Sequence, residues 1–126
     1  MLSNLEFHTT IPVKDLERAK VFYREKLGLS PSQETPGGLV YESVRGSWFF
    51  LFPSQSAGTA QNTVMAWVAD DIAAEVAELK SRGVVFEEYD SPGFKSADSI
   101  VTMPSSRNAW FKDSEGNTLG IAQLNG

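Results

Sequence analysis

The chain has 126 residues, of which 41% are hydrophobic and 21% charged, and it contains no cysteine. This length suits one compact domain, and the composition is too apolar for a disordered chain. The net charge of −5 would repel a nucleic-acid backbone. The lack of cysteine excludes disulfides, thiolate nucleophiles and cysteine-based zinc sites. No run approaches the roughly 20 apolar residues that span a bilayer, so we expect a cytoplasmic protein without membrane or nucleic-acid partners.

The first half of the chain predicts a strand, a helix and a hairpin. Residues 5–13 alternate between apolar and polar side chains, which is typical of a strand with two different faces. Asp15 is a helix cap for residues 16–27, and Gly28 is a typical helix end. Two short strand-like runs follow and predict a hairpin, 39–44 and 47–52.

The second half repeats this order. Residues 63–68 predict a strand, Asp70 and Asp71 offer a cap for the next helix, and Gly83 marks its end. Further strands are predicted at 84–89, 99–103, 108–112 and 118–124. The second half also carries an insertion, about 91–107, and the sequence leaves open whether this insertion acts as a lid.

The chain therefore consists of two β-α-β-β-β units, neither of which can bury its sheet face alone. We expect them to pair in a single α+β domain over residues 1–126. Module one covers about 1–54, a connector about 55–62, and module two about 63–126. The sequence leaves open whether the modules pair within one chain or between two chains.

Alternate residues of the predicted strands fall into two sets. One set is apolar and suits packing beneath the helices, whereas the other mixes aromatic, small and polar side chains. The mixed set predicts a ligand cleft with an apolar lining, formed by Trp48, Phe50, Phe52, Met65 and Trp67. Polar groups would orient the ligand, namely His8, Thr10 and Thr63, and Arg107 would bind an anion beside the cleft unless it lies in a solvated loop. Alternatively, the aromatic residues fill a core or a subunit interface.

Two runs of the sequence resemble one known superfamily. The run from His8 to Leu29 (HTTIPVKDLERAKVFYREKLGL) resembles the opening of vicinal oxygen chelate proteins, which include glyoxalase I, bleomycin resistance proteins and extradiol dioxygenases. The run 111–121 (FKDSEGNTLGI) is similar to their D-P-D-G-N ending, with Ser114 in place of proline. The resemblance implies paired β-α-β-β-β modules that form a curved half-barrel sheet with helices on the outer face, commonly in a homodimer.

The resemblance also implies where a divalent metal would bind. The four expected ligand positions fall at His8, Phe50, Thr63 and Gly120. Phenylalanine has no donor atom, glycine has no side chain and threonine is a poor ligand, so only His8 suits a metal. A family-type metal site is therefore not expected. An altered site centred on His8 would have to recruit a carboxylate from Glu6, Glu42 or Glu88.

The sequence thus favours a small-molecule binding protein with a degenerate metal site, no cofactor and a planar or amphiphilic ligand. We expect a homodimer that resembles bleomycin resistance proteins more than glyoxalase I. One alternative is a metal-dependent lyase, transferase or dioxygenase of the same superfamily, centred on His8. The other is a dimeric interaction module without a ligand. The sequence identifies neither the ligand nor any catalytic residue.

Overall fold

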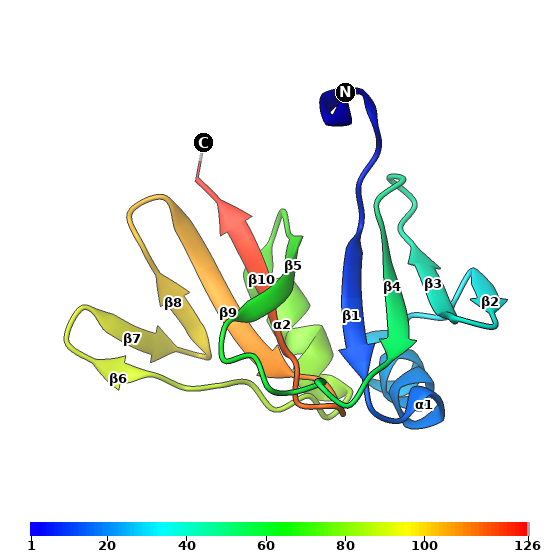
Figure 1. The fold of residues 1–126 in the computed structure, drawn as a ribbon. Helices are drawn as coiled ribbons and strands as arrows, with labels where there is room; N and C mark the ends of the chain where they lie inside the picture. The colour runs from blue at the N-terminus through cyan, green and yellow to red at the C-terminus, as the bar shows by residue number, and fades with distance from the viewer. Residues whose placement is uncertain (126) are drawn as a thin grey trace.

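The computed structural model describes residues 1–125, which form two modules (Figure 1). A short 3-10 helix, Leu2–Asn4, precedes them. The first module comprises β1 (Thr9–Val13), α1 (Leu16–Leu27), β2 (Gln33–Thr35), β3 (Gly38–Glu42) and β4 (Trp48–Pro53). The second comprises β5 (Thr63–Val68), α2 (Ile72–Ser81), β6 (Asp90–Ser91), β7 (Phe94–Ala97), β8 (Ile100–Thr102), β9 (Ser106–Lys112) and β10 (Thr118–Leu124).

Each module contributes one mixed sheet. The strand orders are β1-β4-β3-β2 and β5-β10-β9-β8-β7-β6. β1 pairs in parallel with β4, and β5 in parallel with β10, while the neighbouring pairs are antiparallel. Figure 1 shows the two sheets side by side, with β1 and β5 at the edges that face each other. The predicted α+β fold of two β-α-β-β-β modules is confirmed.

Both helices begin at the residues that the sequence predicts as caps. A side-chain oxygen of Asp15 accepts a hydrogen bond from the main-chain N–H of Arg18 at 3.0 Å, and Asp71 accepts one from Ala74 at 3.2 Å. Each bond satisfies one of the N–H groups that a helix start leaves unpaired. α1 ends at Gly28, whose φ of 71° lies in the left-handed region that glycine adopts without strain.

Several strands differ from the prediction. β1 begins only at Thr9, and β2 is a strand that the sequence analysis did not predict. Residues 84–89 form a single bridge, between Phe86 and Phe111, because this segment runs beside β9 for too short a distance to form a ladder. The insertion folds into β6, β7 and β8, which extend the second sheet.

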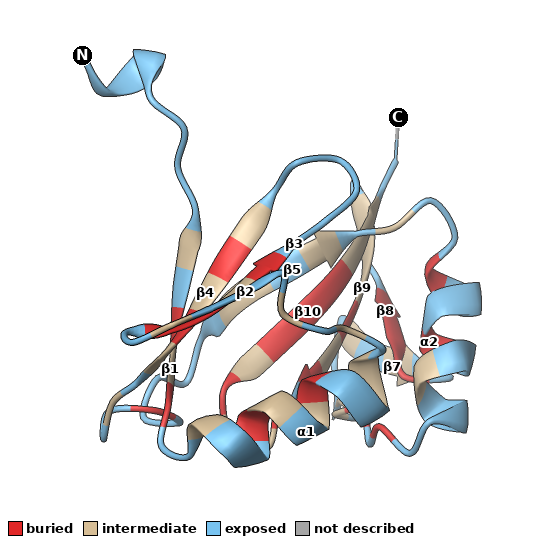
Figure 2. Ribbon diagram, turned by 90° about the vertical axis from the view of Figure 1, so that its right-hand side faces the viewer, coloured by how far each residue is buried: buried red, intermediate tan, exposed pale blue. Residues whose placement is uncertain are grey.

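One continuous core lies on the helix side of both sheets. Ile11, Leu51 and Phe111 are fully buried within it. The modules meet where the ring of Phe49 contacts that of Trp67, with 6.3 Å between the ring centroids. Figure 2 shows buried residues along the strands and on the inward sides of the helices, whereas the segment before β1 is exposed. The two modules therefore share their hydrophobic stabilisation.

The turn between β9 and β10 ties the second module to the first. The buried carboxylate of Asp113 accepts hydrogen bonds from the hydroxyl of Tyr23 at 2.8 Å and from the amide of Asn117 at 3.0 Å. Its other oxygen accepts main-chain N–H groups of Glu115 and Asn117, both at 2.9 Å. The same Asn117 amide donates to the carbonyl of Pro12 at 2.8 Å. These bonds fix α1 and β1 to the turn.

Tyr23→Phe is expected to destabilise this connection. The variant removes one donor from the buried Asp113 carboxylate, so we expect the free energy of unfolding to fall by about 1–3 kcal/mol in urea denaturation at pH 7. Tyr89→Phe is the matched control, because the Tyr89 hydroxyl makes no hydrogen bond within residues 1–125, and its effect should stay within about 0.5 kcal/mol. A Tyr23→Phe loss no larger than that of the control would contradict this role.

Candidate functional site

The first sheet has one face covered by α1 and an opposite, open face. Strand neighbours that pair directly share a face, so Thr10, Phe50 and Val40 lie together, and the buried Ile11 and Leu51 lie on the helix side. The open face of the first sheet consists of Thr10, Pro12, Val40, Glu42, Trp48, Phe50 and Phe52. The structure thus places Thr10 and the three aromatic residues of β4 on the face that the alternation predicts.

His8 precedes β1 and stacks on Trp48 at the end of this face. The ring centroids are 3.6 Å apart and the rings are nearly parallel, at 13°. An open hollow of about 290 Å³ adjoins this stack, and it is lined by Glu6, Gln33, Val40, Glu42, Gly46 and Trp48. Neither carboxylate of the hollow forms an ion pair within residues 1–125. An aromatic plane beside two negative charges favours a flat organic cation.

A tight turn between β2 and β3 positions Phe50. The hydroxyl of Thr35 accepts hydrogen bonds from the main-chain N–H groups of Gly37 at 3.2 Å and Gly38 at 3.1 Å. Any Cβ at Gly38 would lie 2.9 Å from Cζ of Phe50 and 2.0 Å from the carbonyl oxygen of Leu51. The absence of a side chain at this position therefore lets the backbone approach the Phe50 ring closely.

The second sheet differs from the prediction at β5. Thr63 pairs with Thr118, but Met65 pairs with Leu119, so the register shifts within β5. Because successive side chains point to opposite faces, a shift of one residue reverses every later position. The predicted placement of Met65 and Trp67 on the open face is therefore wrong.

Trp67 instead lies on the helix side. It pairs with the buried Ile121, and its ring is parallel to that of Phe111, with 6.4 Å between centroids. Thr63 remains on the open face, where its Cγ2 would lie 3.4 Å from a Cβ placed on Gly120. Of the predicted site residues in β5, only Thr63 is thus found on the predicted face.

An aromatic cluster that the sequence analysis missed lies on the open face of the second sheet. Trp110 pairs with Gly120, and its ring centroid lies 5.5 Å from that of Tyr89 and 5.7 Å from that of Phe94. Phe94 belongs to the insertion, so this segment brings an aromatic side chain to the sheet. Ala109 and Phe111, the residues before and after Trp110, are buried on the helix side. The alternation along this strand would therefore have placed Trp110 on the open face.

Arg107 lies on the helix side of the second sheet. It pairs with Gln123, whose side-chain oxygen accepts a hydrogen bond from the main-chain N–H of Ile72 at the start of α2, at 2.8 Å. Ala109, two residues further along the same strand, is fully buried. The predicted position of Arg107 beside the aromatic open face is therefore wrong. Side chains two residues apart in a strand share a face, so Arg107 lies on the same side of the sheet as the buried Ala109.

The four positions that correspond to family metal ligands do not fit a divalent metal. Phe50 supplies no donor, and a Cβ at Gly120 would already lie 3.3 Å from Cδ1 of Trp110. A carboxylate at position 120 would thus require Trp110 to move. Residues 1–125 contain no group of three or more histidine, cysteine, aspartate or glutamate side chains arranged to hold a metal. The four positions therefore do not supply the three protein ligands that a catalytic metal ordinarily needs.

The family of the chain follows from its sequence together with this fold. The sequence model of the Glyoxalase/Bleomycin resistance protein/Dioxygenase superfamily matches residues 7–121. The chain belongs to this superfamily. A search of curated proteins finds no match. Within residues 1–125 of this superfamily member, neither helix is both long and apolar enough to cross a membrane.

Several solved structures share this fold over nearly the whole chain. TnmS3, an antibiotic binding protein from Streptomyces sp. CB03234, is 25% identical with a TM-score of 0.70, and the match covers 96% of this chain and 98% of TnmS3. UcmS2 is 21% identical with a TM-score of 0.72, covering 91% and 94%. Lactoylglutathione lyase from Agrobacterium tumefaciens is 23% identical with a TM-score of 0.65, covering 94% and 92%.

Proposed function

We propose that this protein binds a planar, amphiphilic small molecule with a positively charged group on the open face of its first sheet. The observation that carries the proposal is the Trp48 ring, which stacks on His8 beside the carboxylates of Glu6 and Glu42. Neither carboxylate forms an ion pair with another of the residues 1–125. The ligand would lie over Trp48 and extend its apolar part toward Phe50 and Phe52. The likeness to TnmS3, an antibiotic binding protein, supports a small-molecule ligand.

Polar groups at the edge of this face would orient the ligand. The side chains of His8 and Thr10 are both exposed, Thr10 in the edge strand β1 and His8 just before it, so they can donate or accept hydrogen bonds at the ligand's rim. Glu42 pairs with Trp48 across β3 and β4, which places its carboxylate beside the aromatic plane. A cation bound there would gain both electrostatic attraction and contact with the ring.

A second copy of the chain would complete the site. The open faces of both sheets carry half-buried aromatic residues. Contact between two copies would bring this face against the open face that holds Thr63 and Trp110. The exposed side chains of Leu5 and Phe7, at 61% and 93%, add apolar surface for such an interface.

Calorimetric titration with two planar probes of opposite charge tests the ligand class. We expect 9-aminoacridine, a cation, to bind saturably and about tenfold more tightly than 9-anthracenecarboxylate, because two exposed carboxylates favour it. Sedimentation velocity of the same samples reports the dimer. Failure of both probes to bind would contradict the proposed ligand class, as would equal affinity for the anion.

A further inference from the structure

A separate cavity of about 260 Å³ lies on the helix side of the second sheet, where the two modules meet. The end of α1 contributes Leu27, the segment that follows it contributes Leu29, and α2 contributes Glu75 and Leu79. The sheet side is lined by Trp67, Val68, Ala69, Phe111 and Ile121. This cavity shares no lining residue with the hollow beside Trp48, so it does not depend on the function proposed for the open face.

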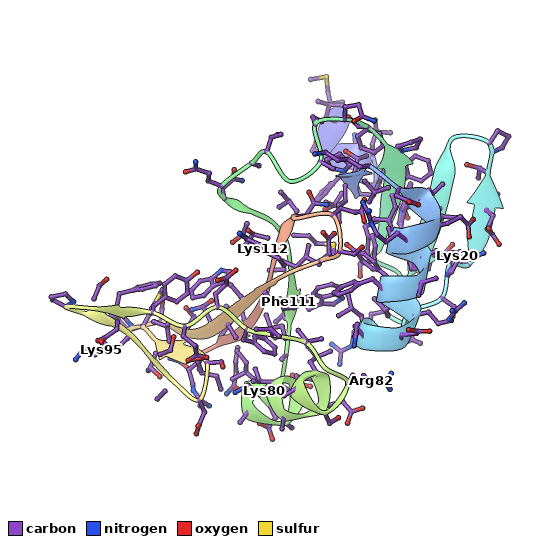
Figure 3. The ribbon with its side chains drawn as sticks, turned by 90° about the horizontal axis from the view of Figure 1, so that it is seen from below. Lys20, Lys80, Arg82, Lys95, Phe111 and Lys112 are labelled. Carbon is purple, nitrogen blue, oxygen red and sulfur yellow. The ribbon has the colours of Figure 1, made fainter. Side chains whose placement is uncertain are left out.

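The walls of this cavity suit a single aromatic ring. Phe111 is fully buried and Trp67 is half-buried, and their rings are parallel within 12°. Figure 3 shows Phe111 near the middle of the molecule, with α1 and α2 on different sides of it. The volume exceeds the roughly 150 Å³ that holds benzene in an apolar cavity, and it falls just below the range of about 300–1,000 Å³ for larger ligands. A ring with a short side chain therefore matches the space.

Glu75 sets the charge that the cavity would accept. It is the one ionisable residue of the lining, and it forms no ion pair within residues 1–125. The next acidic residue of the helix, Glu78, is paired with Arg82 at 3.0 Å, so that guanidinium is already engaged. A carboxylate at the wall of an apolar cavity attracts a cation and repels an anion.

We propose that this cavity binds a small arylalkyl amine. The aromatic ring would lie against Trp67 and Phe111, and the ammonium group would approach the Glu75 carboxylate. Leu79 lies one helical turn after Glu75 and would contact the alkyl chain. Because Leu27 and Leu29 come from the other module, the bound amine would bridge the two modules and stabilise their contact.

Fluorescence titration with 2-phenylethylamine tests the proposal. The double variant Trp48→Phe and Trp110→Phe leaves Trp67 as the only tryptophan, so its emission reports this cavity alone. We expect the amine to change the emission saturably and to bind about threefold more tightly than 2-phenylethanol, its neutral analogue. Glu75→Gln should equalise the two affinities, whereas Glu17→Gln, an acidic residue in the first turn of α1, should leave the ratio unchanged.

Two filling variants separate loss of the cavity from loss of the fold. Leu79→Trp should abolish binding of both probes, and Leu79→Phe, which is smaller and safer for folding, should weaken both. Calorimetric titration measures binding to these two variants, because Leu79→Trp adds a tryptophan to the cavity, and calorimetric melting establishes that each variant folds. Binding that is unchanged by Glu75→Gln and by both fillings would overturn the proposal. No saturable change in Trp67 emission at millimolar amine would also overturn it. Neither result would bear on the site beside Trp48.

Discussion

Glu115→Gln is expected to lower the free energy of unfolding at pH 7 by about 3 kcal/mol. The Glu115 side chain is fully buried, and it lies in the turn between β9 and β10, which is hydrogen-bonded to the first module. Its carboxylate accepts five hydrogen bonds of 2.8 to 2.9 Å, from the main-chain N–H groups of Lys14 and Asp15, two groups of the Arg18 guanidinium and the Ser114 hydroxyl. A neutral amide loses the ionic part of these bonds and leaves some donors unpaired.

The loss should depend on pH. Burial alone would raise the pKa of Glu115, but the hydrogen bonds from Arg18, the backbone of Asp15 and Ser114 outweigh it and lower the pKa from 4.5 to about 2. A lowered pKa in the folded protein means that the carboxylate stabilises the fold above about pH 4.5. This stabilisation disappears as the pH falls through about 2. The difference between wild type and Glu115→Gln should therefore fall to about half or less at pH 3.

Urea denaturation at pH 7, 5 and 3 measures this difference. Glu17→Gln is the matched control, because Glu17 forms no ion pair within residues 1–125, and we expect an effect within about 0.5 kcal/mol. The account of the turn is wrong if Glu115→Gln costs the same at pH 3 as at pH 7. A loss below about 1 kcal/mol at pH 7 would also count against it.

Trp48→Ala is expected to weaken binding of 9-aminoacridine by about 2 kcal/mol, which is about thirtyfold. The variant removes the aromatic plane that stacks on His8 and forms one wall of the hollow. Because Trp48 is only half-buried, the protein should still fold. Calorimetric titration measures the affinity, and Trp48→Phe should keep part of it because a smaller ring remains.

Val44→Ala is the matched control for Trp48→Ala. Val44 is fully exposed in the same hairpin and lies outside the hollow, so its truncation should change the affinity less than twofold. An effect of Trp48→Ala below about threefold would show that the probe binds elsewhere.

Local chemistry explains why much of the fold could be predicted. A cap at Asp15 and a left-handed stop at Gly28 depend on neighbouring residues alone, and both helices follow from such features. The faces of β1 and β4 were also predictable, because their alternation is uninterrupted. β2 was missed because three residues between turns carry no visible period.

The faces of the second module could not be predicted as well, because they depend on pairing between strands. The register shift in β5 moves the side chains of Met65 and Trp67 to the opposite face of the sheet. The alternation of apolar and polar residues gives no sign of the one extra residue that causes this shift. Arg107 was expected beside the cleft or in a solvated loop, although it lies in β9 on the same face as the buried Ala109. The face of Trp110 could have been predicted from the alternation in β9, but its contacts with Tyr89 and Phe94 could not, since these side chains come from other segments and meet it only in the fold.

The position of a bound planar cation tests the central proposal most directly. Amide chemical shifts of the protein can be recorded by NMR with and without saturating 9-aminoacridine. We expect the largest changes at residues 8–10, 40–42 and 48–52, which surround Trp48 on the first sheet. Changes that concentrate at Trp67 and Phe111 instead, or an absence of changes around Trp48, would contradict the proposal.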